Sequence, residues 1–336
     1  MSSAELTDLF IQRIRTLEAL MDNARTYAVT AATGHVGGHA ARGLLRAGHQ
    51  VRVMGRDHAR LKELEAAGAE VLAGDLADQG YVEDAFADVD GALLIVPPRP
   101  AAPDFPRYQR RIARVYASAA ERTGLRHAAF VSTKGADDGR VGGLIAGHAA
   151  IESILNQVDG LNVVHVQPPS FFEILYYFLG PLRERAVLSS PLGTDATLQL
   201  VSARDVAAVA VRLLGDPHFR GVSAAPVHPI RPMTMREIAT LLSEHLGRPV
   251  GVEQTSAEAD IADLMAAGTG RSFATLLNQT WAMATALGEA PWEEPPPATQ
   301  AAYRIEDFIR DELVPAIRSS RPISDYSTAT RPRRAA

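Results

Sequence analysis

A glycine-rich segment marks the place where this chain could bind a phosphorylated ligand. It reads Thr30-Ala-Ala-Thr-Gly34-His-Val-Gly37 and directly follows an apolar run that is typical of a strand. Glycines in such a turn let the backbone approach a pyrophosphate, and the free N–H groups and dipole of the following helix favour that negative charge. The segment predicts nucleotide binding, with a structural turn in a ligand-free sheet as the alternative.

The second apolar run ends beside residues that could select the nucleotide. The stretch from Val51 to Gly55 has no acid at its end, where an Asp or Glu would hold the ribose 2′-OH of NAD, and it is followed by Arg56 and Asp57. Because a guanidinium can pair with a 2′-phosphate in bidentate fashion, NADP(H) is favoured over NAD(H). The alternative is that Arg56 is a solvated surface charge and Asp57 a helix cap.

Two later strand ends could also contact the cofactor. Asp75, followed by Leu76, comes after the third apolar run and could accept a hydrogen bond from the adenine amino group, although a plain turn explains it too. Val96 and Pro97 end the fourth run, at the carboxyl edge where ligands of open α/β sheets bind. Proline there could equally just end the strand.

The usual proton-donating pair of short-chain dehydrogenases is absent from the sequence. That pair is a Tyr whose pKa is lowered by a Lys four residues later on one helix face. The only lysines are Lys62 and Lys134, and the residues four positions before them are His58 and Phe130. A reaction that depends on this dyad is therefore excluded.

Other polar residues could take part in catalysis instead. His148 and Glu152 are one helical turn apart, and His148 is the best acid or orienting residue for a nicotinamide ribose or a substrate oxygen. The alternative is a partly buried structural histidine. Ser132 and Lys134, at the end of the fifth apolar run, could place a hydroxyl and an ammonium beside a reacting carbonyl. Ser132 is a reasonable polarising group, and the alternative for Lys134 is that it simply faces water.

Aromatic residues after the sixth apolar run could line a substrate pocket. Phe171, Phe172 and Tyr176 would do so if the chain crosses the mouth of the cofactor cleft at this point. Packing into a core explains Phe171 and Phe172 equally well.

Composition narrows the classes of function. The chain has no cysteine, which excludes thiolate chemistry and Cys-based metal sites, and it has no HExxH, GxSxG or P-loop motif. A net charge of -5 argues against a nucleic-acid surface. No apolar run is long enough to cross a bilayer and no signal peptide is recognisable, so a cytoplasmic, metal-free protein without membrane contact is expected.

Short apolar runs that alternate with amphipathic segments predict an α/β fold, a Rossmann-type parallel sheet with a smaller, mostly helical C-terminal substrate lobe. The six predicted strands are Tyr27–Thr30, Val51–Met54, Glu70–Leu72, Ala92–Val96, His127–Ser132 and Asn162–Val166. The predicted units are an amphipathic helix (1–26), the Rossmann domain (27–166), the substrate lobe (167–318, of which 197–214 could return to the sheet) and a mobile tail (319–336). The N-terminal helix could mediate a homodimer or bind a protein partner.

Taken together, these motifs resemble those of the NmrA-like family of atypical short-chain dehydrogenase/reductases. The family's TGATGxxG turn is matched by Thr30 to Gly37, its Arg-Asp by Arg56-Asp57 and its V-S-x-x-D by Val201 to Asp205. The chain departs from the pattern at Ala31, Gln167 and Ile174, where the family has Gly, Arg and Asn. The family's active-site Lys aligns with His148, and its Tyr aligns with Leu144.

The resemblance implies a Rossmann fold and a set of cofactor-binding residues. That set is Thr33, Gly34, His35, Val36, Gly37, Arg56, Asp75, Leu76, Val96, Pro97 and Pro168. The family includes NADPH-dependent reductases and proteins that bind NADP without turnover. We therefore expect an NADPH-dependent oxidoreductase acting on a small apolar or aromatic quinone, enone or ketone, with a catalytically silent NADP(H)-sensing regulator as the alternative.

Overall fold

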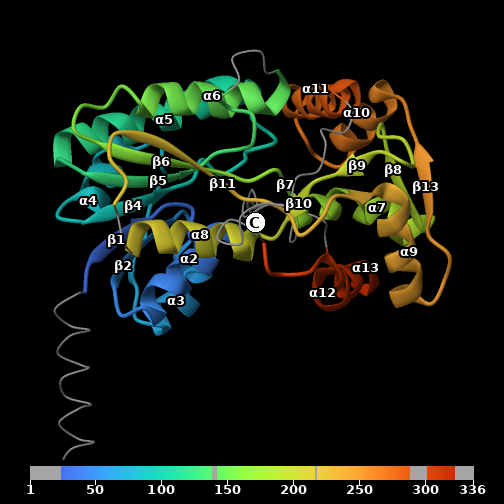
Figure 1. Ribbon diagram of the computed structural model, residues 1–336, viewed down its shortest axis with the longest axis horizontal. Coiled ribbons are helices and arrows are strands. Elements are labelled where there is room, and N and C mark those ends of the chain that lie inside the picture. Colours follow the sequence, from blue (N-terminus) through green and yellow to red (C-terminus); the bar gives the residue numbers. More distant parts are fainter. Residues whose placement is uncertain (1–23, 138–141, 216–217, 288–300, 322–336) are drawn as a thin grey trace, which may run out of the picture.

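A seven-stranded parallel sheet is the centre of the computed structural model, which describes residues 24–137, 142–215, 218–287 and 301–321 (Figure 1). The strand order is β11-β6-β5-β4-β1-β2-β3. These strands are β1 (Thr26–Val29), β2 (Gln50–Gly55), β3 (Glu70–Ala73), β4 (Gly91–Leu94), β5 (His127–Val131), β6 (Asn162–Gln167) and β11 (Val222–Pro226). The chain winds outward in both directions from β1, so the carboxyl ends of all seven strands lie at one edge.

The six predicted strands are confirmed, with ends that differ from the prediction by at most two residues. The seventh strand was not predicted. It reads Val222-Ser-Ala-Ala-Pro226 and pairs in parallel with β6, with Val222 opposite Val163. Its small residues bury little apolar surface at the sheet edge, so they give no apolar run for a sequence pattern to detect.

Helices cover both faces of the sheet (Figure 1). One face is covered by α2 (His35–Arg46), α3 (Lys62–Ala66) and α8 (Ala203–Gly215), and the short η1 (His58–Arg60) precedes α3. The other face is covered by α4 (Gln79–Phe86), α5 (Phe105–Thr123) and α6 (Gly143–Leu155). Leu44 and Val206 are fully buried on the first face, and Ile112, Tyr116 and Ile151 on the second. This three-layer arrangement confirms the Rossmann-type α/β prediction.

A smaller, mostly helical lobe has an apolar core of its own, built around Leu175, Leu179, Ile238, Phe308 and Leu313. Its elements are β7 (Ser170–Phe171), η2 (Phe172–Phe178), α7 (Leu179–Glu184), β8 (Val187–Ser190), β9 (Thr197–Leu198), β10 (Leu200–Val201), β12 (Met233–Thr234), α9 (Met235–Leu246), β13 (Gly251–Gln254), α10 (Ala257–Ala266), α11 (Arg271–Leu287), α12 (Ile305–Phe308), η4 (Ile309–Leu313) and α13 (Val314–Arg318).

The segment 197–214 divides between the lobe and the sheet. Strands β9 and β10 pair with β12 and β7, outside the central sheet, whereas α8 packs on α2 and on the sheet face.

The predicted boundaries between the units stay a prediction. The predicted N-terminal helix lies outside the described residues, as does the tail beyond Arg321. In the part of the chain that the structure describes, no helix is long and apolar enough to cross a membrane.

The glycine turn is held between two strands. Thr30 is fully buried, and its hydroxyl bridges to β4 by donating to Leu93 and accepting from the Ile95 N–H at 2.7 Å. The Ala32 N–H donates to Met54 of β2 at 2.9 Å. Ala31 has a φ of 50°, a left-handed conformation that glycine adopts more readily. A Cβ atom on Gly37 would lie 2.6 Å from the Ala31 carbonyl oxygen, so α2 can pack this closely only with glycine there.

We expect Gly37→Ala to lower the free energy of unfolding by about 1–3 kcal/mol, because the added methyl meets backbone and forces the turn away from α2. Urea unfolding of the purified variant measures this change. Gly80→Ala is the matched control, since Gly80 lies in α4 and a Cβ atom there would come no closer than 3.6 Å to its nearest neighbour. That control should be neutral or stabilising, and equal stability of the two variants would contradict the close-packing argument.

Candidate active site

The phosphate-binding end of the site is the start of α2. Gly34 is the N-cap of this helix and supplies no side-chain hydrogen bond, so the first N–H groups of α2 can receive an anion. Thr33 is half-buried, and its carbonyl oxygen lies 3.4 Å from a guanidinium nitrogen of Arg60. His35 is exposed, and its ring stacks on that of Tyr176 at 6.2 Å. The cradle and its open donors fit a dinucleotide pyrophosphate.

The predicted adenosine-side residues gather around Tyr108 of α5. The Tyr108 hydroxyl donates to the Pro97 carbonyl oxygen at 3.0 Å. Burial raises the pKa of Tyr108 to about 12, and the charges of Arg56 and Asp75 also act on this hydroxyl. The Arg56 side chain is exposed to solvent, so a phosphate group can reach it. Three strand ends that are far apart in sequence thus face one another here.

The other residues predicted to contact the cofactor are held by hydrogen bonds and packing within the protein. Leu76 and Val96 are buried in the core on the α4–α6 face. The Asp75 carboxylate accepts from the Ala77 N–H at 2.9 Å, and the Asp57 carboxylate accepts from the Ala59 N–H at 3.0 Å. These are the local turn and capping contacts that the alternative interpretations describe. Their roles toward a cofactor stay predictions.

Ser132 lies at the carboxyl end of β5 and is 2% exposed. Its hydroxyl donates to the Glu152 carboxylate, and Gln167 donates to the same oxygen at 3.2 Å. The chain after Ser132 runs beside Pro168, whose carbonyl oxygen accepts from the Lys134 N–H at 2.7 Å. The Lys134 ammonium donates to Gln199 at 2.9 Å, on the surface. Ser132 is therefore oriented by a buried carboxyl.

His148 is half-buried on α6, where its ring stacks on Phe130 of β5 at 6.1 Å. Its Nδ1 is buried with no hydrogen-bond partner among the described residues. Burial lowers the pKa of His148 to about 4. The imidazole is thus neutral near pH 7 and cannot act there as an imidazolium acid. Its predicted role toward a ligand stays a prediction, with a structural histidine as the alternative.

The three predicted pocket aromatics lie in different surroundings. Phe172 and Tyr176 are 4% and 3% exposed and pack in the core of the C-terminal lobe, each against Phe308 at 5.6 Å. Phe171 is half-buried and packs against the core on the α2–α8 face. Tyr176 reaches the α2 terminus through His35. It is the member of this group best placed to face a ligand, although a substrate-binding role for all three stays a prediction.

Comparison with known proteins agrees with this geometry. Residues 23–281 match the sequence pattern of the NmrA-like family. The chain belongs to that family.

Two curated relatives of this NmrA-like protein are reductases. One is NAD(P)H azoreductase of Xenophilus azovorans, 30% identical over 76% of this chain and 86% of the relative. The other is (4-alkanoyl-5-oxo-2,5-dihydrofuran-3-yl)methyl phosphate reductase of Streptomyces griseus, 31% identical over 71% of this chain and 80% of the relative. A solved structure of an NADPH-dependent quinone oxidoreductase from Escherichia coli, complexed with NADPH, has a TM-score of 0.71 at 20% identity and covers 84% of this chain and 98% of its own. That last likeness shows the fold.

Sequence reasoning missed three groups in this NmrA-like site. Arg60 of η1 contacts the glycine turn through the Thr33 carbonyl oxygen. The one sequence signal for this contact is that Arg60 follows Arg56 by four residues. Glu173 has a buried carboxyl oxygen with no partner among the described residues, and burial raises its pKa while the charge of His35 lowers it. Glu152 was expected to matter through His148, yet it bonds Ser132 and Gln167 instead. Each contact depends on the fold rather than on sequence spacing.

The pKa of His148 makes stability depend on pH. Its pKa falls from 6.5 to about 4 on folding, so below pH 6.5 the unfolded chain binds a proton that the folded chain does not. Acidification from about pH 6.5 to 4 should therefore lower the free energy of unfolding, with at most about 3 kcal/mol from this residue. His148→Phe should show a shallower decline in urea unfolding measured across that range. Parallel curves for the variant and the wild type would refute the assignment.

Proposed function

We propose that this protein is an NADPH-dependent oxidoreductase that reduces a small, conjugated, largely apolar acceptor. The observation that carries the proposal is the likeness over most of the chain to two reductases, one of which is named for azo compounds and the other for an unsaturated lactone. The open helix terminus at Gly34 supports dinucleotide binding. Arg56 and Arg60 beside the turn support the 2′-phosphate form.

Quinones and enones fit the missing Tyr-Lys dyad best. When bound, the cofactor supplies a hydride. A conjugated acceptor delocalises the incoming negative charge, so it needs less help from a strong acid than a simple ketone does. At the place where the family pattern has its Tyr, this chain has Leu144, which cannot donate a proton. Ser132 supplies a hydroxyl at the strand edge, and the neutral His148 orients the ligand.

The reductase is tested by following absorbance at the reduced-nicotinamide band with purified protein, NADPH and a panel of quinones, enones and azo dyes. We expect acceptor-dependent oxidation of NADPH, because the site holds the cofactor beside an apolar lobe. NADH should be used less well. Tight NADPH binding by fluorescence titration without oxidation by any acceptor would instead favour a silent NADP(H)-sensing regulator, which the lost dyad also permits.

Arg56→Ala should weaken NADPH binding about tenfold to a hundredfold, the value of a charge-assisted contact with the 2′-phosphate, and leave NADH binding unchanged. Arg60→Ala tests the second guanidinium in the same way. Arg236→Ala is the control, because Arg236 pairs with Asp195 on the exposed surface of the C-terminal lobe. Dissociation constants come from fluorescence titration. Equal losses for NADPH and NADH would remove the 2′-phosphate assignment.

A further inference from the structure

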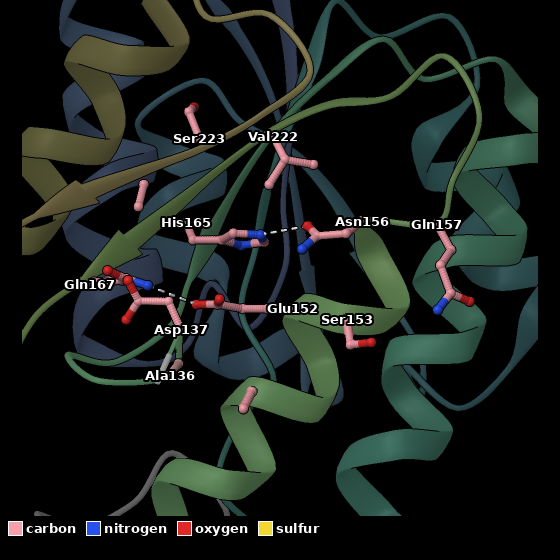
Figure 2. A pocket seen from close by; sticks show the side chains of 12 residues that line it. Ala136, Asp137, Glu152, Ser153, Asn156, Gln157, His165, Gln167, Val222 and Ser223 are labelled. Carbon is pink, nitrogen blue, oxygen red and sulfur yellow. Dashed lines mark hydrogen bonds between the residues drawn. The ribbon is translucent and has the colours of Figure 1, made fainter. Parts of the chain in front are cut away.

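Ser132, Glu152 and Gln167 form a buried hydrogen-bonded group at the carboxyl end of the sheet. Their residues are 2%, 6% and 7% exposed. Ser132, which directly follows β5, and Gln167 of β6 both donate to one carboxyl oxygen of Glu152. Figure 2 shows Glu152 projecting from α6 and its bond with Gln167. Glu152 thus joins the ends of two neighbouring strands through its carboxyl group.

Glu152 also lines a pocket that opens on the far side of this group. The pocket holds about 580 Å³ and lies between α6, β6 and β11. Its wall includes Asp137, Ser153, Asn156, His165 and Val222 (Figure 2). One side chain therefore touches both the hydroxyl at the sheet edge and a space large enough for water.

The hydrogen-bond partners of Glu152 are neutral, so they are compatible with either an ionised or a protonated carboxyl group. The two hydrogen bonds that it accepts come from the neutral groups of Ser132 and Gln167, and no Lys or Arg is among the described residues that line the pocket. An arginine in contact would hold the carboxyl as an anion. When ionised, Glu152 accepts from Ser132; when protonated, it can donate to the same hydroxyl.

We propose that Glu152 supplies the proton of the reduction through Ser132, in place of the absent Tyr-Lys dyad. The inference rests on the proposed function. When bound, NADPH would supply a hydride, with both electrons, to the conjugated acceptor. The acceptor's oxygen or nitrogen then takes the proton from the Ser132 hydroxyl as that O–H bond breaks. Ser132 is reprotonated by the Glu152 carboxylic acid, and the carboxylate takes a proton from water in the pocket.

Other titratable groups also face Glu152 and must be separated from it. His165 of β6 is bonded through Nε2 to Asn156 at 2.7 Å, and burial lowers its pKa while the charge of Glu152 raises it. His148 lies one turn earlier on α6, with a pKa of about 4. Asp137 lines the same pocket from the loop after β5. Because burial lowers the pKa of both histidines, neither is a cation near neutral pH.

The test compares kcat across pH for the wild type and Glu152→Gln, with NADPH and the best acceptor from the panel. Glutamine keeps the acceptor for Ser132 but carries no exchangeable acid. We expect kcat to fall about 100-fold, the range for loss of general acid catalysis. NADPH affinity should be retained. The pH dependence of kcat should be weaker in the variant, because one group that can carry a proton has been removed.

Two further measurements keep the proposal open to refutation. Ser132→Ala should lose kcat similarly, and the double variant should lose little more than either single variant, since the two residues act in series. The solvent deuterium isotope effect on wild-type kcat should shrink in both single variants. Glu121→Gln, on the exposed surface of α5, is the matched control and should behave as wild type.

The outcomes separate the two proposals. If Glu152→Gln turns over like the wild type and with the same pH profile, the proton path is overturned and the reductase proposal stands. If Glu152→Gln does not fold, the same result for Ser132→Ala has the same meaning. Absence of wild-type turnover with every acceptor would overturn the reductase, and the proton path would fall with it. A kcat loss shared by the control would show a general effect of lost carboxyl charge, against the proposal.

Discussion

The hydroxyl of Thr30 joins the two strands between which the sheet changes its direction of winding. It is fully buried and bonds to Leu93 and Ile95, so β1 and β4 end side by side at the carboxyl edge. The crevice of an open α/β sheet forms where the strand order reverses in this way. The glycine turn above β1 and the Pro97 loop beyond β4 take their positions from this one link. The glycine turn, Pro97 and Ser132 all follow strands that end at this edge.

The repeating apolar runs of the first half of the chain were enough to predict the sheet, because parallel strands that are buried on both faces must be apolar throughout. The strand β11 was missed because small residues at an edge give no such signal. The glycine turn could be located from its letters, but the left-handed Ala31 could not, since nothing in an alanine indicates a positive φ. The bonds of Glu152 could not be foreseen either, because they join α6 to two strands that only the fold brings together.

The polar groups of this site are arranged differently from a dyad on one helix face. In a dyad, spacing along one helix sets the distance between acid and cation. Here a helix and two strand ends each contribute one group, so the arrangement of Ser132, Glu152 and Gln167 depends on how α6 packs on β5 and β6. His148, which occupies the position of the family's Lys, stacks on Phe130 and stays neutral. Ser132, Glu152 and Gln167 are thus more deeply buried than His148.

The positive φ of Ala31 couples ligand binding to the integrity of the molecule. An alanine in this conformation is less stable than a glycine by about 1–2 kcal/mol, and the strain falls on the glycine turn that precedes α2. A dinucleotide that binds only the folded turn adds to stability in proportion to the logarithm of its concentration over its dissociation constant. Bound dinucleotide would therefore offset the conformational cost that Ala31 adds to the folded state.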